Sequence, residues 1–379
     1  MVAKKKSKRT TTSRKAGKRK KKIGSKTVFS IDMLPADHGD CLIVTYGTGT
    51  KLSRMLIDCG TTNTVDRLQA RLRTLKPSIK KFDLFVLTHI DADHIGGSID
   101  FFNEGAGGLS FEDVWFNGWK HLPRKRLSAK QGEIFTTLIE DNELPWNRWM
   151  DGKAILVKGT ALPTTTLKGG MKITLLSPTL KKLESLSPVW QKELDKHGFG
   201  SDKARRRYYR QFLGGTTPTM SNVEKLANSK FSPDGSKPNG SSIAFLAEYE
   251  GKRVLFSGDA HASVLKASIA KLLAETGDKR LKLDAFKLPH HGSRANVSTD
   301  VMKMLDCQHY LVSTSGAQFK HPDGEAMARV VIHGGEQPIL HFNYRTKYNE
   351  FWGKAAAQKK FGHRTKFPAK GKEGITLNL

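Results

Sequence analysis

Four side chains that commonly bind metal ions follow one another within six positions of this sequence. They are His89, Asp91, Asp93 and His94, in the stretch THIDADH. Imidazole nitrogens and carboxylate oxygens at this density suit divalent first-row metals. The stretch therefore predicts a metal site, and an ordinary polar loop at the surface is the alternative interpretation.

The residues on either side of this stretch predict how its side chains are positioned. An apolar run over residues 84–87 predicts a buried strand that ends just before the first histidine. Gly96 and Gly97 follow, and they allow the backbone to turn tightly. At a strand end, alternate residues would point His89, Asp91 and Asp93 one way, and His94 would reach a second ion.

A second group of metal-binding side chains lies near the other end of the chain. Asp259 follows a predicted strand over residues 253–256, and His290 and His291 follow another over residues 284–288. Strand ends that converge in space can assemble a buried metal site from distant parts of a sequence. The alternation of strands and helices along the chain favours an α/β layer architecture.

The first cluster resembles the H-x-H-x-D-H signature of the metallo-β-lactamase superfamily, with Asp91 where most members have histidine. That variant, together with the segments HGDCLIV, LIDCG and PHHGS, is similar to the ComEC-type branch, named for the hydrolase domain of a bacterial DNA-uptake channel. The resemblance runs from about residue 28 to the C-terminus, apart from residues 180–240. ComEC is a membrane protein, whereas no run of 18 apolar residues occurs here, so we expect a stand-alone soluble form.

The resemblance implies two divalent metal ions held by His89, Asp91, Asp93, His94, Asp259 and His290. The first two would hold one ion, the next two and His290 the other, and Asp259 would bridge both. His291 would face the substrate, although the reverse assignment of the two histidines stays open. Asp58 would lie beneath the metals and orient their ligands, with a simple turn role as the alternative.

One further ligand of the first ion, a histidine in most of the superfamily, has no counterpart here. Asn239 stands near that place and offers only an amide oxygen. A site with one imidazole and several oxygen ligands favours Mn²⁺ or Mg²⁺ more than a three-histidine zinc site does. We therefore expect Zn²⁺ or Mn²⁺, with Mg²⁺ as an alternative, and a first site that is weak or empty.

Other residues are candidates for catalysis and for substrate binding. The predicted catalytic residues are Asp93, His291 and His321. The predicted substrate-binding residues are Ser293, Arg294, Arg205, Arg206, Arg207 and Tyr208. Arginines interleaved with tyrosine suit phosphates and bases, with a solvated helix face as the alternative. A plain loop role for His321 also stays open.

The charge of the chain favours a polyanionic partner. The 379 residues carry a net charge of +28, and residues 1–26 hold 13 Lys or Arg and no acid. Removing those 13 charges leaves +15 on the remainder, so nucleic acid is the expected partner. A solvated tail is the alternative. Three cysteines without paired spacing predict reduced thiols in a reducing compartment. The ComEC-type resemblance implies a bacterial cytoplasm, and the basic tail leaves a nucleus as the alternative.

Together these patterns predict an αββα metallo-β-lactamase sandwich over residues 27–379, with an inserted lid at 180–240 and a disordered basic tail at 1–26. The expected function is a metal-dependent phosphodiesterase or nuclease in which a metal-bound hydroxide attacks nucleic acid, with DNA favoured. Two alternatives stay open: a hydrolase of a lactone, thioester or cyclic nucleotide, and a non-catalytic nucleic-acid-binding protein. The oligomeric state stays unknown.

Overall fold

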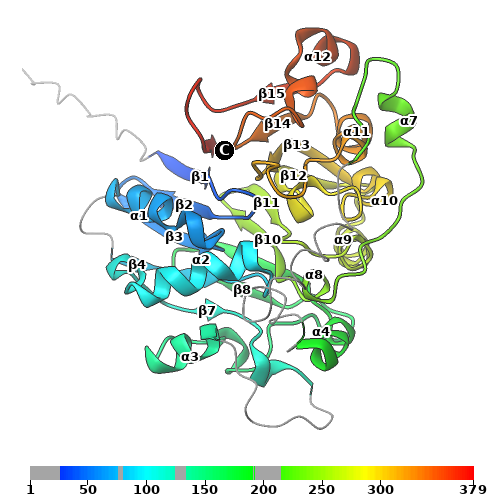
Figure 1. Ribbon diagram of the computed structural model, residues 1–379. Helices are drawn as coiled ribbons and strands as arrows, with labels where there is room; N and C mark the ends of the chain where they lie inside the picture. The colour runs from blue at the N-terminus through cyan, green and yellow to red at the C-terminus, as the bar shows by residue number, and fades with distance from the viewer. Residues whose placement is uncertain (1–25, 76–79, 124–133, 191, 193–214) are drawn as a thin grey trace, which may run out of the picture.

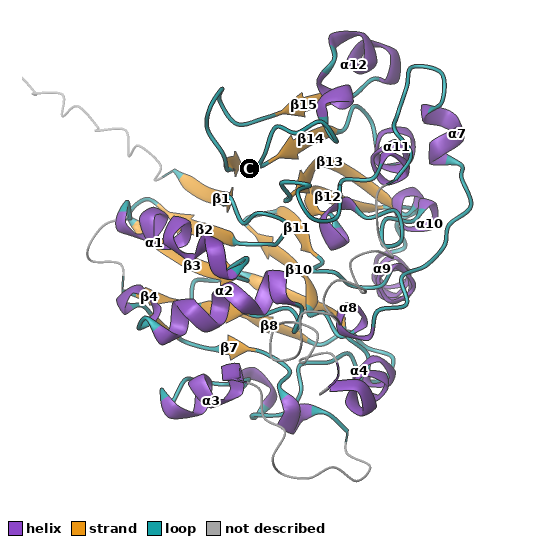
Figure 2. Ribbon diagram, viewed as in Figure 1, coloured by secondary structure: helices purple, strands orange, loops and turns teal. Residues whose placement is uncertain are grey.

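Two β-sheets lie face to face at the centre of the molecule, and helices cover the outer face of each (Figure 1). Coloured by secondary structure, the strands gather in the middle and the helices at the periphery (Figure 2). This four-layered arrangement confirms the predicted αββα fold. The computed structural model describes residues 26–75, 80–123, 134–190, 192 and 215–379.

The first sheet has six strands, and its apolar residues are buried on both faces. In order across the sheet they are β16 (Ile375–Asn378), β1 (Thr27–Met33), β2 (Leu42–Thr48), β3 (Lys51–Ile57), β5 (Leu84–Val86) and β7 (Val114–Trp115). The first four pair antiparallel, whereas β3, β5 and β7 run parallel. In β5, Leu84 and Val86 belong to the core between the sheets, and Phe85 belongs to the cluster on the other face. This alternation follows the two-residue period of a strand.

The second sheet has eight strands. In order they are β15 (Arg364–Lys366), β14 (Ile339–Phe342), β13 (Leu305–Val312), β12 (Leu281–Lys287), β11 (Lys252–Phe256), β10 (Ala244–Tyr249), β9 (Lys172–Ser177) and β8 (Thr164–Thr166). Strands β11 to β15 are parallel, and β8 to β11 are antiparallel. Val44 of the first sheet and Phe245 of the second lie in the same apolar core. Two short strands, β4 (Lys81–Phe82) and β6 (Ser110–Phe111), pair separately.

The helices form the two outer layers. Those beside the six-stranded sheet are α1 (Val65–Arg73), α2 (Ala92–Asn103) and α3 (Ile134–Asp141). Those beside the eight-stranded sheet are α9 (Ala262–Thr276), α10 (Thr299–Lys303) and α11 (Gly324–His333), and α12 (Ala355–Phe361) follows β14. No helix in the described part of the chain combines the length and hydropathy needed to span a bilayer.

The described parts of residues 180–240 are packed against the body of the protein. They include α4 (Leu180–Leu186), α7 (Val223–Ala227) and α8 (Lys237–Gly240). Leu183 and Leu226 are buried in the two apolar clusters. Residues 193–214, like the tail over residues 1–25, lie outside the described residues, so the lid and the disordered tail stay predictions.

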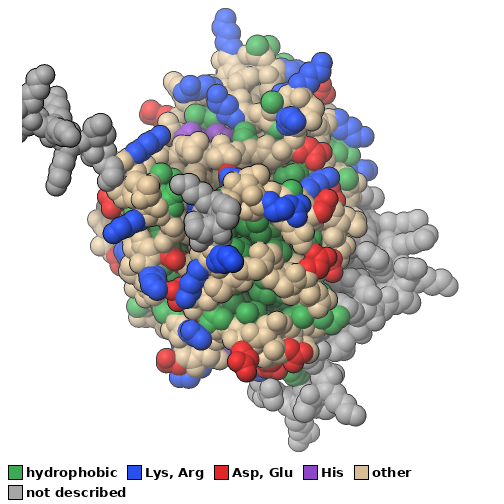
Figure 3. All heavy atoms as spheres, turned by 90° about the vertical axis from the view of Figure 1, so that its left-hand side faces the viewer, with side chains coloured by type: hydrophobic (Ala, Val, Ile, Leu, Met, Phe, Trp, Pro, Cys, Tyr) green, Lys and Arg blue, Asp and Glu red, His purple; other side chains and the backbone are tan. Residues whose placement is uncertain are grey.

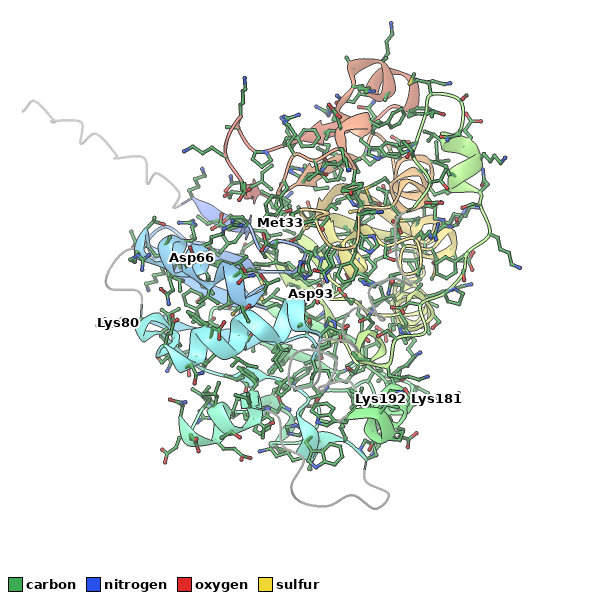
Figure 4. The ribbon with its side chains drawn as sticks, viewed as in Figure 1. Met33, Asp66, Lys80, Asp93, Lys181 and Lys192 are labelled. Atoms are coloured by element: carbon green, nitrogen blue, oxygen red, sulfur yellow. The ribbon has the colours of Figure 1, made fainter. Side chains whose placement is uncertain are left out.

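The carboxyl ends of several parallel strands meet at one edge of the two-sheet core. Strands β3 and β5 end there from the first sheet, and β11, β12 and β13 from the second. Open α/β sheets commonly bind ligands at such an edge. Figure 4 places Asp93 near the middle of the molecule, at the end of α2 that faces the second sheet. The candidate site lies at this edge.

Candidate metal centre

Two of the four clustered residues, Asp93 and His94, lie in the first turn of α2 rather than on a strand end. Asp91 is the residue before the helix, with extended backbone angles (φ −69°, ψ 145°). The expected strand-like alternation was therefore wrong at this point. Successive residues of a helix are rotated by about 100°, so the two side chains leave the turn in different directions.

Gly96 and Gly97 lie inside α2, so the tight turn predicted for them is absent. A Cβ atom on Gly97 would lie only 2.3 Å from the carbonyl oxygen of Cys59. The lack of a side chain thus lets α2 pack directly on the loop that follows β3. This packing brings His94 next to Asp58, whose Oδ2 lies 2.8 Å from Nδ1 of the histidine.

Three imidazole nitrogens at this edge are buried and have no hydrogen-bond partner within the described residues. They are Nε2 of His89, His94 and His291. The Nδ1 atom of each ring is held elsewhere: by Thr88 Oγ1 at 3.0 Å, by Asp58, and by the Ser313 carbonyl oxygen at 2.8 Å, respectively. A buried polar atom without a partner costs about 1–3 kcal/mol. These residues therefore fit divalent metal ions, which take the lone pair of such a nitrogen.

Asp259 lies between the imidazole groups and presents an oxygen to each. Its Oδ2 is 3.8 Å from Nε2 of His89 and 3.9 Å from Nε2 of His290, and its Oδ1 is 3.6 Å from Nε2 of His94. Oδ2 of Asp91 is 3.6 Å from Nε2 of His89. Separations of this size suit two ligand atoms bound to one ion, because metal–ligand bonds of about 2.0–2.2 Å meet between them.

A second group of ligand atoms contains His291 and not the histidine that precedes it. Asp93, His94 and His291 present atoms that all lie within 4.8 Å of one another. Nε2 of His291 is 3.3 Å from Oδ2 of Asp93. The preference for His290 in this group therefore does not fit the geometry. Both histidines have left-handed backbone angles (φ 49° and 56°), and His290 Nδ1 instead faces Asn296 at 2.9 Å.

The charges of this cluster stabilise each other against the cost of burial. Burial alone raises the pKa of Asp93 and of Asp259, but the neighbouring histidines, His94 foremost, hold both pKa values below the usual range. Burial lowers the pKa of His291, yet Asp259 and Asp40 raise it to about 9. The centre therefore holds buried carboxylates that stay ionised, as metal ligation requires.

Asn239 lies at the first-site end of this cluster and is buried. Its Nδ2 donates to Oδ2 of Asp234 at 2.7 Å, and its Oδ1 has no partner in the described part of the chain. Within the described residues, the oxygen is thus the atom of the Asn239 amide that lacks a hydrogen-bond partner. Sequence reasoning proposed Asn239 as a weak ligand, which stays a prediction, and did not single out Asp234, which lies in a Gly, Ser and Pro-rich stretch that predicts only a loop.

A polar cavity of about 340 Å³ adjoins the cluster. Its lining residues are Ser229, Lys230, Ser232, Pro233, Asp234, Gly235, Ser293, Arg294, Ala295, His321, Asp323, Glu325 and Arg329. His321 is buried, its Nδ1 lies 3.2 Å from Oδ1 of Asp323, and its Nε2 has no partner among the residues described. The ring centres of His321 and His290 are 5.4 Å apart. Three predicted functional residues, Ser293, Arg294 and His321, thus line one cavity.

Some predicted residues cannot be placed, and some placed residues were not predicted. Arg205, Arg206, Arg207 and Tyr208 lie outside the described residues. Asp40 is a buried partner of Lys287 and lies 3.5 Å from Nδ1 of His291. This ion pair differs from an ordinary surface pair in that both charges are buried, and their burial cannot be predicted from the sequence alone. Half-buried His38 also belongs to this region, because its charge interacts with that of Asp93.

Residues 34–157 match the family model described as the metallo-beta-lactamase superfamily. This domain belongs to that superfamily. The match includes the cluster from His89 to His94 and ends before the second sheet, which carries Asp259, His290 and His291. No curated protein sequence matches the chain.

Solved structures of the superfamily fold resemble the chain at low identity. The metallo-beta-lactamase fold protein YhfI from Bacillus subtilis shares 12% identity over 93% of this chain and 100% of its own, with a TM-score of 0.40. The diiron beta-hydroxylase CmlA from Streptomyces venezuelae shares 13% identity over 94% of this chain and 54% of its own, with a TM-score of 0.40. The subclass B3 metallo-beta-lactamase MEM-A1, from a soil metagenome library, shares 11% identity over 72% of this chain and 78% of its own, with a TM-score of 0.30.

The chain therefore has a metallo-hydrolase fold with candidate metal-ligand groups at the strand ends. The buried, unpartnered nitrogens of three histidines and the two oxygens of Asp259 form adjacent ligand sets. A polar cavity lies beside them at the same edge. This geometry suits hydrolysis assisted by divalent ions.

Proposed function

We propose that this protein is a metal-dependent phosphodiesterase that acts on nucleic acid, with DNA as the favoured polymer. The observation that carries the proposal is the polar cavity beside the candidate metal centre, which is lined by three basic and three acidic side chains. Arg294 and Lys230 line this cavity, and the Arg294 side chain is 53% exposed. Guanidinium and ammonium groups are the side chains that bind phosphate oxygens.

The carboxylates in the cavity wall are already engaged, so they oppose an anionic substrate less than free acids would. Oδ2 of Asp323 accepts from the backbone N–H of Arg294 at 2.8 Å, and its Oδ1 accepts from that of Gly215 at 2.9 Å. Glu325 accepts from the backbone and hydroxyl of Thr216. None of the described lining residues is Phe, Tyr or Trp, so the cavity suits a phosphate and its sugar better than an acyl chain or a base.

Two divalent ions at such a centre would supply an activated water and would offset charge that develops on phosphate oxygens. His89, Asp91 and Asp259 would hold one ion, together with His290. Asp93, His94 and His291 would hold the other. This allotment of the two histidines is supported by the 3.3 Å distance between His291 and Asp93, since Nε2 of each histidine lies 3.9 Å from Oδ2 of Asp259.

The remaining residues would handle the substrate. Arg294 would hold a non-bridging phosphate oxygen. Ser293, which is buried at the end of the turn over residues 290–293, would orient the phosphate. His321 would carry a proton at Nε2 to the leaving oxygen, while Asp323 holds its Nδ1. A positioned acid of this kind typically contributes 10²–10⁴-fold in rate.

The overall charge supports a polymeric substrate. The +28 chain would attract the phosphate backbone over long range. Lys and Arg side chains are spread over much of the face seen in Figure 3 rather than gathered in one patch. A cavity of about 340 Å³ also fits a small phosphodiester such as a cyclic nucleotide, which is the second candidate substrate.

The deciding experiment is cleavage of labelled single- and double-stranded DNA and RNA by purified protein. Each reaction contains Mn²⁺, Mg²⁺, Zn²⁺ or EDTA and is repeated with the double variant Asp93→Ala, His94→Ala. We expect metal-dependent cutting that the double variant abolishes. A bis-aryl phosphodiester, a cyclic nucleotide, a lactone and a thioester are tested in parallel. Hydrolysis of the last two alone, or of none, would overturn the proposal.

A further inference from the structure

A buried carboxylate, Asp234, stands behind the first of the two candidate metal positions. Its side chain is 1% exposed, and none of the described Lys or Arg side chains forms an ion pair with it. Instead it accepts hydrogen bonds from two side-chain amides, Nδ2 of Asn239 at 2.7 Å and Nδ2 of Asn296 at 3.0 Å. The backbone N–H of Ser236 donates to its other oxygen at 2.8 Å.

The acceptor-only character of this carboxylate determines how both amides are oriented. A carboxylate offers no hydrogen, so the NH₂ groups of Asn239 and Asn296 must face Asp234 and their oxygens must face away. Oδ1 of Asn296 then lies 2.9 Å from Nδ1 of His290. Nδ2 of Asn239 also lies 3.3 Å from Nδ1 of His290, but the shorter contact is to the Asn296 oxygen, which can only accept. We therefore assign the ring hydrogen to Nδ1 and the lone pair to Nε2.

His290 faces the first metal position, and Asn239 lies against the same imidazole, with its Nδ2 3.3 Å from Nδ1 of His290. Nε2 of His290 lies 3.9 Å from Oδ2 of Asp259, which also faces His89. Oδ1 of Asn239 is buried and lacks a partner in the described residues. Asp234 therefore prepares one imidazole nitrogen and one amide oxygen at the place where the expected histidine is missing.

We propose that Asp234 is a positioning residue that builds the first metal site, through Asn296 on His290 and directly on Asn239. The inference rests on the proposed metal centre and adds how its weaker half is completed. The resulting set combines two imidazoles with the oxygens of Asp91, Asp259 and Asn239. A set so rich in oxygen ligands favours Mn²⁺ over a site built from histidine alone.

A purely structural role for Asp234 is the competing explanation, because the same contacts join two loops. The test is therefore metal stoichiometry rather than activity. Metal-free protein is titrated with Mn²⁺ by calorimetry, and the loaded protein is examined by electron paramagnetic resonance, in which two adjacent Mn²⁺ ions give a spin-coupled signal. The variant is Asp234→Asn, and the control is Asp66→Asn on the exposed face of α1, far from the centre (Figure 4).

We expect the wild type and Asp66→Asn to bind two ions and give the coupled signal. In Asp234→Asn the first-site affinity should fall 10- to 100-fold, as when other groups that orient metal ligands are removed, and the signal should become that of an isolated ion. If folded Asp234→Asn binds two ions with wild-type affinity, the inference is overturned while the proposed function stands. A wild type that binds no ion would overturn the proposed function itself.

A second variant keeps the test decisive if Asp234→Asn does not fold. Asn296→Ala removes the link to His290 and leaves Asp234 bonded to Asn239 and Ser236. We expect the same selective loss of the first ion. Two ions bound with unchanged affinity would overturn the inference.

Discussion

Nδ1 of His94 lies 2.8 Å from Oδ2 of Asp58, while Nε2 of the same ring is buried and lacks a partner among the described residues. The Asp58 carboxylate accepts a hydrogen bond from Nδ1–H of the ring. The lone pair therefore stays on Nε2, which faces Asp93 and Asp259. Oδ1 and Oδ2 of Asp58 also accept from the backbone and hydroxyl of Thr88. One acidic residue thus orients both the histidine and the loop that precedes it.

Replacing Asp58 by asparagine should weaken metal binding without removing a ligand. The amide can turn its NH₂ group toward His94, which would favour the wrong tautomer. We expect a 10- to 100-fold loss in affinity for Mn²⁺ or Zn²⁺, measured by competition with a chelating dye. Ser98→Ala is the control, since Ser98 donates to the backbone carbonyl oxygen of His94 rather than to its ring. Equal affinities in Asp58→Asn and the wild type would contradict this role.

The adjacent glycines of α2 should respond differently to the same substitution. A Cβ on Gly97 would lie 2.3 Å from the Cys59 carbonyl oxygen, whereas a Cβ on Gly96 would meet only the Thr62 methyl group at 3.3 Å. We expect Gly97→Ala to lower the free energy of unfolding by about 1–3 kcal/mol, because backbone cannot yield easily. Gly96→Ala should change it little, since higher helix propensity offsets the contact. Urea unfolding of both variants measures the difference, and equal midpoints would refute it.

Lys287→Met should destabilise the protein strongly. Lys287 is 1% exposed, and it donates to Asp40, whose pKa it lowers to about 2 against the opposing effect of burial. Removing one partner of a buried pair leaves an unpaired charge, which costs about 3–5 kcal/mol.

The double variant Lys287→Met, Asp40→Leu removes both charges and should recover most of the lost stability. Thermal and urea unfolding of the two variants and the wild type test this pairing. A double variant no more stable than the single one would show that the ion pair is not the cause.

His341 should make the protein less stable as the pH falls below neutrality. It is buried on β14 with Nε2 3.0 Å from Nδ1 of His309, and burial, then His309 and Lys366, lower its pKa to about 3. Between about pH 6.5 and pH 3 the unfolded chain binds more protons than the native one, so stability falls as the pH falls. The expected loss is about 1–2 kcal/mol by pH 5.

The variant His341→Gln removes this titration and should flatten the pH dependence. Urea unfolding at pH 7, 6 and 5, with EDTA present throughout, separates the effect from metal ligation. The remaining slope includes His309 and the other histidines whose pKa values are lowered mainly by burial, His121, His261 and His363. A constant difference between variant and wild type from pH 7 to pH 5 would contradict the assignment.

The regular parts of the fold could be predicted because their apolar residues repeat with a clear period. The strands expected over residues 253–256 and 284–288 are β11 and β12. The three cysteines are buried and free, as expected. Helix α11, in contrast, was missed, because its glycine start and small residues resemble a loop.

The candidate site was predictable in its residues and less so in their arrangement. The density of histidine and aspartate shows which side chains gather, but not that α2 begins at Ala92 and rotates Asp93 away from Asp91. The division of roles between His290 and His291 depends on the left-handed backbone of the turn, which sequence alone does not show. Contacts across the chain, such as Asp234 with Asn296, need the folded structure.

The candidate ligands come from both sheets: those from His89 to His94 follow β5, and Asp259, His290 and His291 follow β11 and β12. Ions bound between them would act as a removable cross-link that ties the two halves of the sandwich. By mass action, a hundredfold excess of ion over its dissociation constant adds about 2.7 kcal/mol to stability. Metal supply would then govern the lifetime of the folded protein as well as its turnover, and starvation for metal would expose the chain to proteolysis.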